Sequence, residues 1–403
     1  MSQNSNLSLV HIGLQSAATA WGTVASSLVS LDADPMNPAI DKERLQSPSM
    51  SGDGLDVASR PGRTMADMPS IALPLRGCKS GGAGDSVSSG GGTNNTVLDV
   101  LLQSFFGQAP ASATGETTDA VDAGTGTTVT ADAASSFTAG DGLIVAGTSS
   151  GKLNARQVVS VSSADITVDR ALLNDGSADT ANESSVIYAM DSYKLDFDGT
   201  NHKAFTLKHS KDGGQVDTFI GCQAASLELS FPRGGDARAT FGGIDFSDYS
   251  SGESAGTYSA PTVGDNVVCL DSPFFIGGTE AYAYDIAVNI TADLQMRAAD
   301  GTPRGHAGFA VVKKTVECTA KILLGSLGRE YAEGDIEANL RSASTLDVAF
   351  QHGRSAGAIS YVRIPAASTQ SAKVVSENGQ EVLVWVFRAV APASGEAFTL
   401  HLG

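Results

Sequence analysis

Hydrophobic and polar residues alternate along much of this chain, and the clearest example lies near its middle. Leu227, Leu229 and Phe231 occupy every second position, with polar residues between them. Successive side chains of a β-strand point to opposite faces of a sheet, so this segment predicts a strand with one buried and one wet face. Residues 232–236, Pro-Arg-Gly-Gly-Asp, then predict a turn, and residues 237–241 alternate again. Together they predict a β-hairpin.

The same two-residue period predicts further strands in the second half of the chain. Residues 285–293 and 315–322 each place apolar side chains on one face and polar side chains on the other. Within the central hairpin, Glu228 is expected diagonally across from Arg238 on the exposed face. Residues 382–387 differ, because both sets of alternating positions are apolar. Such a strand should be covered on both faces, by a helix, a second sheet or another subunit.

The first half of the chain predicts one helix and one long loop. Residues 96–106 carry apolar side chains at helical spacing, and Asn95 is a suitable N-cap. Residues 34–68 lack periodicity and contain several prolines and glycines, which predicts a long extended loop or arm. Long loops of this kind usually carry function or contact a partner, so the arm is a candidate contact element.

Residues 115–190 differ from the rest of the chain in the length and spacing of their apolar segments. They contain short apolar segments at close, regular spacing with turn residues between them, which predicts a small barrel or sandwich of ~70 residues. This region follows a linker of small residues at 110–114 and has the character of an insertion. We therefore predict a mainly β protein in which residues 1–114 and 191–403 form one domain and residues 115–190 form an inserted all-β domain.

Composition and charge narrow the classes of function. The chain has 44 acidic and 26 basic residues, for a formal net charge of −18. Nucleic-acid binding proteins rely on Lys and Arg to replace the counterions of the phosphates, so this balance disfavours DNA binding. A protein whose surface DNA slides past without binding is compatible with this acidic charge.

The cysteines, histidines, glycines and apolar segments of the chain do not predict catalysis, metal binding or a membrane span. The four cysteines are far apart and are interpreted as reduced apolar fillers, and the six histidines lack metal-ligand spacing. The glycine-rich residues 80–92 lack the lysine of a phosphate-binding loop. No segment approaches the roughly 20 apolar residues that span a bilayer. We predict no enzyme, no cofactor, no metal site and no membrane association, in a protein made in the cytoplasm.

Three short segments resemble a known family, the major tail tube proteins of long-tailed, siphovirus-like bacteriophages. They span most of the chain outside residues 115–190. They are Val-His-Ile-Gly-Leu-Gln at 10–15 with Trp-Gly-Thr at 21–23, Phe-Ile-Gly-Cys at 219–222 with Ser-Leu-Glu-Leu at 226–229, and Phe-Arg-Ala-Val-Ala-Pro at 387–392 with Ala-Phe-Thr-Leu at 397–400.

The resemblance implies a fold and a function. Its members have a β-sandwich or barrel flanked by a short helix, and their subunits close into rings, commonly sixfold, that stack into the tube. The implied function is a structural virion protein whose channel conducts DNA during ejection. The implied partners are other copies of the chain, the tape measure protein, the tail terminator and the baseplate or tail-tip proteins. The implied location is the phage tail, after synthesis in the bacterial host cytoplasm.

The resemblance also assigns provisional roles to residues. The arm at 34–68 would reach a neighbouring subunit or ring, the turn at 232–236 would contact the next ring, and the insert would lie outside the tube. The acidic candidates for the channel wall are Glu228, Asp285 and Asp293; the candidates in the arm are Asp41, Arg44, Leu55 and Arg60; those in the turn are Arg233 and Asp236.

Two alternatives belong to other classes. A β-rich virion-surface or secreted module that binds carbohydrate, such as an adhesin, would suit the inserted domain. Aromatic residues, on which sugars stack, make up only 6% of the chain, which disfavours the carbohydrate-binding hypothesis. A head–tail connector or capsid-decoration protein is the second alternative.

Overall fold

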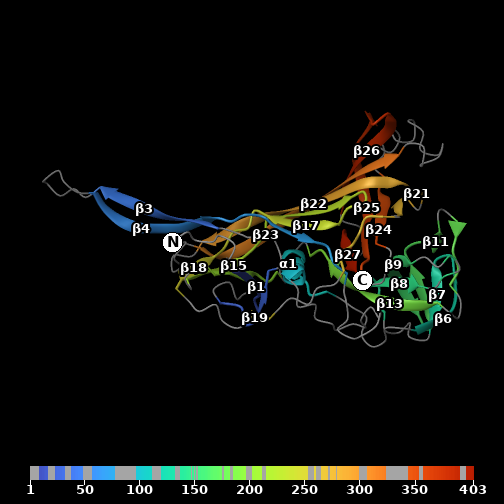
Figure 1. Ribbon diagram of the computed structural model, residues 1–403, viewed down its shortest axis with the longest axis horizontal. Helices are drawn as coiled ribbons and strands as arrows, with labels where there is room; N and C mark the ends of the chain where they lie inside the picture. The colour runs from blue at the N-terminus through green and yellow to red at the C-terminus, as the bar shows by residue number, and fades with distance from the viewer. Residues whose placement is uncertain are drawn as a thin grey trace, which may run out of the picture.

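Strands dominate the computed structural model of the chain, with a single helix, α1 (Val97–Phe106), in the part it describes (Figure 1). This confirms the predicted mainly β class and the helix at 96–106. The structure describes residues 9–16, 23–31, 38–48, 57–77, 97–110, 119–131, 137–146, 148, 150, 153–174, 177–181, 185–196, 202–210, 215–252, 258–259, 265–270, 273–277, 279–298, 306–323, 344–353, 357–390 and 396–403.

A large sheet of seven consecutive antiparallel strands forms the middle of the molecule. The predicted hairpin at its centre is confirmed, because Ser230 pairs with Arg238 and Glu228 pairs with Thr240, which places Glu228 and Arg238 on a diagonal. In order across the sheet the strands are β5 (Ile71–Pro74), β17 (Arg238–Gly242), β16 (Ser226–Pro232), β22 (Ala283–Ala298), β23 (His306–Leu323), β26 (Gln380–Ala389) and β25 (Ser360–Glu377).

The first part of β25 joins this sheet to further strands. It pairs with β24 along one edge and with β27 along the other, β24 continues to β20 and β21, and β27 pairs with β13. Through these pairings the large sheet is connected to the strands of the inserted region. The bounds of these further strands are β20 (Phe274–Ile276), β21 (Thr279–Ala281), β24 (Leu346–His352) and β27 (Thr399–Leu402).

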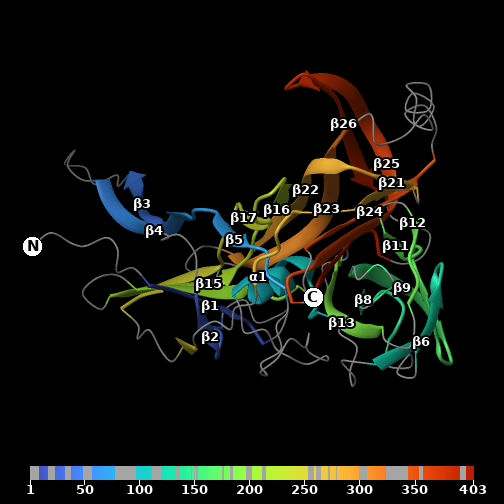
Figure 2. The ribbon, with the colours of Figure 1, turned by 45° about the vertical axis from the view of Figure 1, so that its right-hand side comes forward.

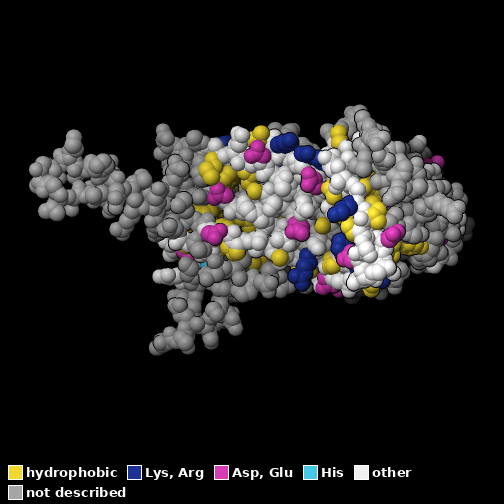
Figure 3. Space-filling model, turned by 90° about the horizontal axis from the view of Figure 1, so that it is seen from above, with side chains coloured by type: hydrophobic (Ala, Val, Ile, Leu, Met, Phe, Trp, Pro, Cys, Tyr) yellow, Lys and Arg dark blue, Asp and Glu magenta, His cyan; other side chains and the backbone are white. Residues whose placement is uncertain are grey.

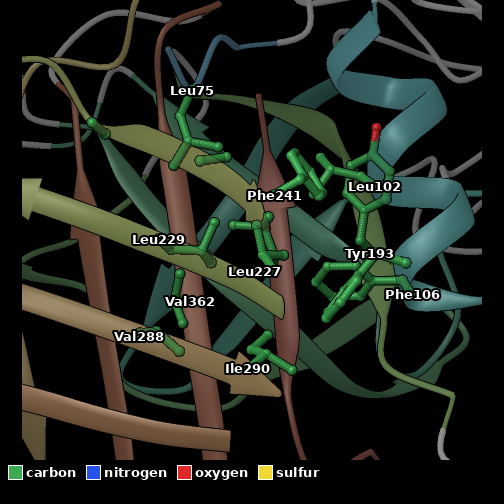
Figure 4. Close-up of a cluster of buried hydrophobic side chains, with 14 of the residues drawn as sticks. Leu75, Leu102, Phe106, Tyr193, Leu227, Leu229, Phe241, Val288, Ile290 and Val362 are labelled. Atoms are coloured by element: carbon green, nitrogen blue, oxygen red, sulfur yellow. The ribbon is translucent and has the colours of Figure 1, made fainter. Parts of the chain in front are cut away.

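One face of the large sheet is covered by the main hydrophobic core. Leu227, Leu229, Phe241, Val288 and Ile290 are all buried on this side. They point toward side chains from α1 and β13, including Leu102, Phe106 and Tyr193 (Figure 4). The alternating apolar positions that predicted these strands therefore form the core-facing side.

A second, six-stranded sheet lies beneath α1 and the core (Figures 1 and 2). Its inner residues Ile12, Leu207 and Phe219 belong to the same core as the large sheet, so the main domain is a sandwich of two sheets with α1 between them. In order the strands are β18 (Asp248–Ser251), β15 (Val216–Cys222), β14 (Phe205–Ser210), β1 (Leu9–Leu14), β2 (Leu28–Ser30) and β19 (Tyr258–Ser259).

The predicted long loop is, over its described part, an antiparallel hairpin of β3 (Ala39–Pro48) and β4 (Val57–Asp67). It projects away from the body (Figure 1). Its prolines suggested a loop, but they occupy positions that a ladder tolerates: Pro48 ends β3, and Pro61 lies opposite Arg44 beside a register shift. The segment is an arm, as expected, but its backbone is a paired ribbon.

The inserted region forms a small closed barrel of its own. The ring of pairings runs β6–β7–β10–β9–β8–β13 and back to β6. A separate core that includes Val129, Phe137 and Ile166 fills it. The strands are β6 (Asp119–Thr125), β7 (Thr128–Ala131), β8 (Gly142–Ala146), β9 (Asn154–Ser162), β10 (Asp165–Val168) and β13 (Val186–Lys194), with β11 (Leu173–Asn174) and β12 (Ser177–Ala178) as a side ribbon.

A buried lysine fastens α1 to the large sheet. The Nζ atom of Lys314, on β23, lies 2.7 Å from the carbonyl oxygen of Phe105, 2.8 Å from that of Asp196 and 2.9 Å from Nε2 of His202. Phe105 is in the last turn of α1, where carbonyl groups lack intrahelical partners. Burial lowers the pKa of the Lys314 amine to about 7.

This lysine is expected to make the stability of the protein rise with pH above neutrality. Between about pH 7 and the ~10.4 of a solvated lysine, the unfolded chain binds a proton that the folded chain has lost. Lys314→Met removes that difference in proton binding. The slope of the free energy of unfolding against pH should then fall by at most about 1.4 kcal/mol per pH unit. Urea unfolding at several pH values measures the slope. Lys313→Met, an exposed neighbour, is the control, and equal slopes for wild type and Lys314→Met would contradict the assignment.

Candidate functional site

The face of the large sheet that points away from the core is open to solvent and is the candidate functional surface. Glu228, Asn289, Asp293, Glu317 and Arg238 are exposed on it. Between these charged or amide positions the strands present small side chains. The small side chains are Ser226, Ser230, Thr240, Ala287, Thr291, Thr315 and Thr319, in neighbouring register positions.

Figure 3 shows this open face as a mostly uncharged surface with separate acidic and basic groups. Each predicted acidic candidate has a basic neighbour. Asp285 forms an ion pair with Lys321 at 3.4 Å, Asp293 lies opposite Lys313, and Glu228 is diagonal to Arg238. The structure thus places Glu228, Asp285 and Asp293 on one face, and that face is mixed in charge.

Asp285 belongs to a small cluster at one end of the open face. The Tyr284 hydroxyl donates a hydrogen bond of 2.6 Å to Glu377 of β25, and Lys321 lies 3.3 Å from the same carboxylate. Desolvation and the hydrogen bond to Glu377 raise the pKa of Tyr284 to about 12, while the bonds from Tyr284 and Lys321 lower the pKa of Glu377. These contacts fix the end of β25 to β22 and β23.

The turn that follows β16 lies at this same end. Gly234 adopts a φ of 68°, which explains the glycine, and Arg233 and Asp236 are both exposed. The turn is braced by residues 265–270, because Asn266 donates a hydrogen bond of 2.9 Å to Asp236 and Gly234 N–H bonds to the Cys269 carbonyl oxygen. The turn is therefore a supported feature of the surface.

The arm leaves from the opposite end of the sheet. It precedes Ile71, which pairs with Phe241, whereas Pro74 pairs with Arg238 close to the turn. Within the arm Asp41 is opposite Met65, Arg44 is opposite Pro61, and Arg60 is opposite Leu45. Leu55 lies outside the described residues. The candidate arm and turn residues are thus at opposite ends of the same strands.

The insert lies on the side of the large sheet that carries α1, away from the open face, in both ribbon views (Figures 1 and 2). Strand β13 is shared, since its first half pairs with β8 and its second half with β27 of the main domain. The predicted boundary at 190 therefore falls inside a continuous strand. A further cluster packs across this junction: Ile144, Ala155, Met190, Ala349, Ile359 and Tyr361.

A buried ionic network joins the insert to the main domain. Arg170 of the insert forms ion pairs with Asp169 at 2.8 Å and with Asp347 of β24 at 3.0 Å. Arg363 of β25 contacts Asp347 at 2.9 Å, and the Tyr361 hydroxyl donates a hydrogen bond to Asp169. Burial alone would raise the pKa of Asp169, but Arg170 and Arg363 outweigh it and hold that pKa below its usual range.

Sequence reasoning missed this network. Its members in the insert and its members in the main domain are far apart in the chain, 177 residues for Arg170 and Asp347, so no local spacing brings them together. The available signal was a charged residue inside an apolar strand, as with Arg363 between Val362 and Ile364. Such a residue, when buried, requires a partner of opposite charge, but the pattern does not say which one.

The fold is mainly β, and its open face carries separate charged groups among small polar side chains. The described residues contain no group of three side chains suited to hold a metal ion, and no helix among them is long and apolar enough to cross a membrane. Residues 196–386 match the model of a family described as phage tail tube protein. The match covers just under half of the chain and includes all of the open face except β5 and the last residues of β26. A search of curated proteins found no match.

This match supports the interpretation that the chain is a structural tail tube protein of a bacteriophage and lies in the virion tail. It does not include the arm or the inserted barrel. It favours the tail tube over the carbohydrate-binding and decoration alternatives.

Proposed function

We propose that this protein assembles into rings that stack into a phage tail tube, with the open face of the large sheet lining the channel through which DNA passes. The observation that carries the proposal is the coincidence of the family match with that face. Residues 196–386 contain β16, β17, β22 and β23, whose wet sides form one continuous polar surface. The tail would be of the long, siphovirus-like kind and the rings sixfold.

The chemistry of the open face suits the passage of DNA. Lysines and arginines bind phosphates by releasing counterions, so unpaired cations in a channel would retain DNA. On this face Lys321 is paired with Asp285 and Glu377, and Lys313 lies opposite Asp293. The rest is mainly hydroxyl and small side chains. The wall would therefore be locally neutral, with Glu228, Asp285 and Asp293 offsetting the nearby cations.

The two ends of the subunit differ, which suits head-to-tail stacking. The arm leaves one end of the large sheet and the turn with Arg233 and Asp236 lies at the other. In a head-to-tail stack these two ends of successive rings face each other, which is a heterologous contact that continues without closing. Contacts from Asp41, Arg44, Leu55 and Arg60 to the next ring are part of this proposal.

The position of the insert suits the outside of the tube. It is fixed to the side of the large sheet opposite the open face, so it would not narrow the channel (Figures 1 and 2). The tape measure protein, the tail terminator and the baseplate or tail-tip proteins would contact the lumen and the tube ends.

Electron microscopy of the purified protein tests this function. We expect hollow tubes or rings, and a three-dimensional reconstruction in which β16, β17, β22 and β23 line the channel. Particles that stay monomeric at high concentration and bind glycans would refute the assembly. A reconstruction with the sheet of β1, β14 and β15 on the channel side would refute the assignment of the open face.

A further inference from the structure

A cleft lies where the inserted barrel meets the main domain. Its volume of about 420 Å³ falls within the roughly 300–1,000 Å³ of ligand-binding pockets. The insert lies away from the open face, so this cleft is separate from the proposed channel wall (Figures 1 and 2). The residues that line it include Ala139, Gln157 and Val159 of the insert and Arg363, Pro365 and Glu396 of the main domain.

A row of three hydrogen-bond donors, here called the donor row, borders this cleft. Thr399 of β27 is the register partner of both Arg363 of β25 and Lys194 of β13. Paired residues of an antiparallel ladder point to the same face, so the hydroxyl lies between the two cationic side chains. Arg363 lines the cleft, and Lys194 Nζ lies 3.4 Å from the carbonyl oxygen of Ala139, which also lines it. The donor row therefore faces the cleft.

Two members of the donor row have donors that the protein leaves without an acceptor. Thr399 is only 1% exposed, and its hydroxyl has no hydrogen-bond partner. The Arg363 guanidinium bonds to Asp347 through Nε and Nη2 and to Gln157 through Nη1 at 2.8 Å. Since a guanidinium has five N–H groups, one on each terminal nitrogen stays free. Buried polar groups are normally hydrogen-bonded, so the unpaired hydroxyl indicates an acceptor that the protein does not itself supply.

The third member, Lys194, has no carboxylate within hydrogen-bonding distance. Its Nζ lies 3.9 Å from Oδ1 of Asp141 and 4.0 Å from Oε1 of Glu396. Its hydrogen bond to the Ala139 carbonyl oxygen is long, at 3.4 Å. Because an ammonium has three N–H donors, Lys194 can also donate to a ligand beside Thr399.

We propose that the cleft binds a small zwitterion, namely an apolar amino acid or a short peptide of such residues. Its carboxylate would accept hydrogen bonds from the donor row, and its ammonium would lie beside Glu396. Charge-assisted hydrogen bonds from guanidinium and ammonium groups to a carboxylate are among the strongest in proteins. Capture of a terminal carboxylate is a recurring mode of peptide recognition.

The charges around the cleft favour a zwitterion over a simple anion. The two cations of the donor row are accompanied by three carboxylates, those of Asp141, Asp347 and Glu396. A multiply charged anion such as phosphate would therefore meet no excess of positive charge, whereas a ligand that brings its own ammonium balances the site. Val159, which is 46% exposed, and Pro365 offer apolar surface for the side chain of the ligand.

Calorimetric titration of the full chain with the dipeptide leucyl-leucine tests the site. We expect saturable binding that weakens at least tenfold when the carboxylate of the dipeptide is amidated. Thr399→Val is the most informative variant, because it keeps the shape and removes only an unpaired hydroxyl, so a thermal melt should show an intact fold. It and Lys194→Met should each weaken binding at least tenfold. Lys373→Met, an exposed lysine of β25 outside the cleft, is the matched control and should leave binding unchanged.

The other ligands in the experiment separate the sources of this chemistry. Equal affinity for free leucine would identify an amino acid site, and binding of the dipeptide alone would identify a peptide site; both support the proposal. No saturable binding of either at millimolar concentration would overturn it. So would binding that neither Thr399→Val nor Lys194→Met weakens, or equal binding of inorganic phosphate. The titration requires no rings or tubes, so its result is independent of the proposed tail tube function.

Discussion

Removal of the arm is expected to abolish polymerisation while the subunit stays folded. The strands β3 and β4 pair only with each other in the described structure, so the hairpin can be shortened without breaking the large sheet. Asp41 and Met65 are register partners. Replacing residues 42–64 by Asn-Gly joins them through a two-residue turn of the kind that closes hairpins. Ile40, which packs against the core, is retained.

The effect on polymerisation is large because every subunit in the stack makes the same arm contact. Each subunit added to a stack would lose its arm contacts, and a loss of about 3 kcal/mol per subunit weakens association more than 100-fold. Sedimentation and negative-stain microscopy measure the polymer, and circular dichroism with a thermal melt measures the fold. Tubes of normal yield from the shortened protein would show that the arm is not an axial contact.

A mixing experiment provides the control. The shortened subunit keeps the turn with Arg233 and Asp236, so it should still accept the arm of a wild-type subunit and then end growth. Excess shortened protein is therefore expected to shorten wild-type tubes. A variant that lacks both the arm and the charges of the turn, through Arg233→Ser and Asp236→Ser, should leave wild-type tubes at their normal length.

The largest loss of stability is expected from Asp169→Ala. The Asp169 side chain is fully buried, and its removal leaves the Arg170 guanidinium with Asp347 as its remaining carboxylate partner. Removing one partner of a buried ion pair typically costs about 3–5 kcal/mol. Chemical denaturation measures this as a fall in the free energy of unfolding. Asp165→Asn, on the exposed side of the same insert, is the matched control and should change it by less than about 0.5 kcal/mol.

The same network gives a pH dependence of known sign. Because the pKa of Asp169 is lower in the folded protein than the ~3.9 of a solvated aspartate, its contribution is present above that pH and is lost as the pH falls through the folded value. The wild type should therefore lose more stability on acidification than Asp169→Ala. A loss below about 1 kcal/mol for Asp169→Ala at neutral pH would mean that Arg170 finds another partner.

The sequence determined the elements that depend on local pattern. Alternation predicted β16, β17, β22 and β23 and the face that each buries, since a strand with one wet side must place its apolar residues on the other. Helical spacing predicted α1. Closely spaced short strands predicted a small barrel or sandwich at 115–190, and the tertiary structure decided for the barrel. Residues 34–68 were predicted as a long loop or arm because of their prolines and glycines, and their described part is instead an antiparallel hairpin, whose pairing no local pattern reveals.

Only the tertiary structure decided how distant parts meet. The apolar residues at both alternating sets of positions in 382–387 predicted that both faces of this strand are covered. In the fold one face lies in the core, where Trp385 is fully buried, whereas Val384 and Val386 on the other face are half-buried. The balance of charge on the open face and the network of Asp169, Arg170 and Arg363 depend on register between strands far apart in the chain. Local sequence specifies which face of a strand is apolar, but the partner of a buried charge or a free edge is set by the packing of the whole chain.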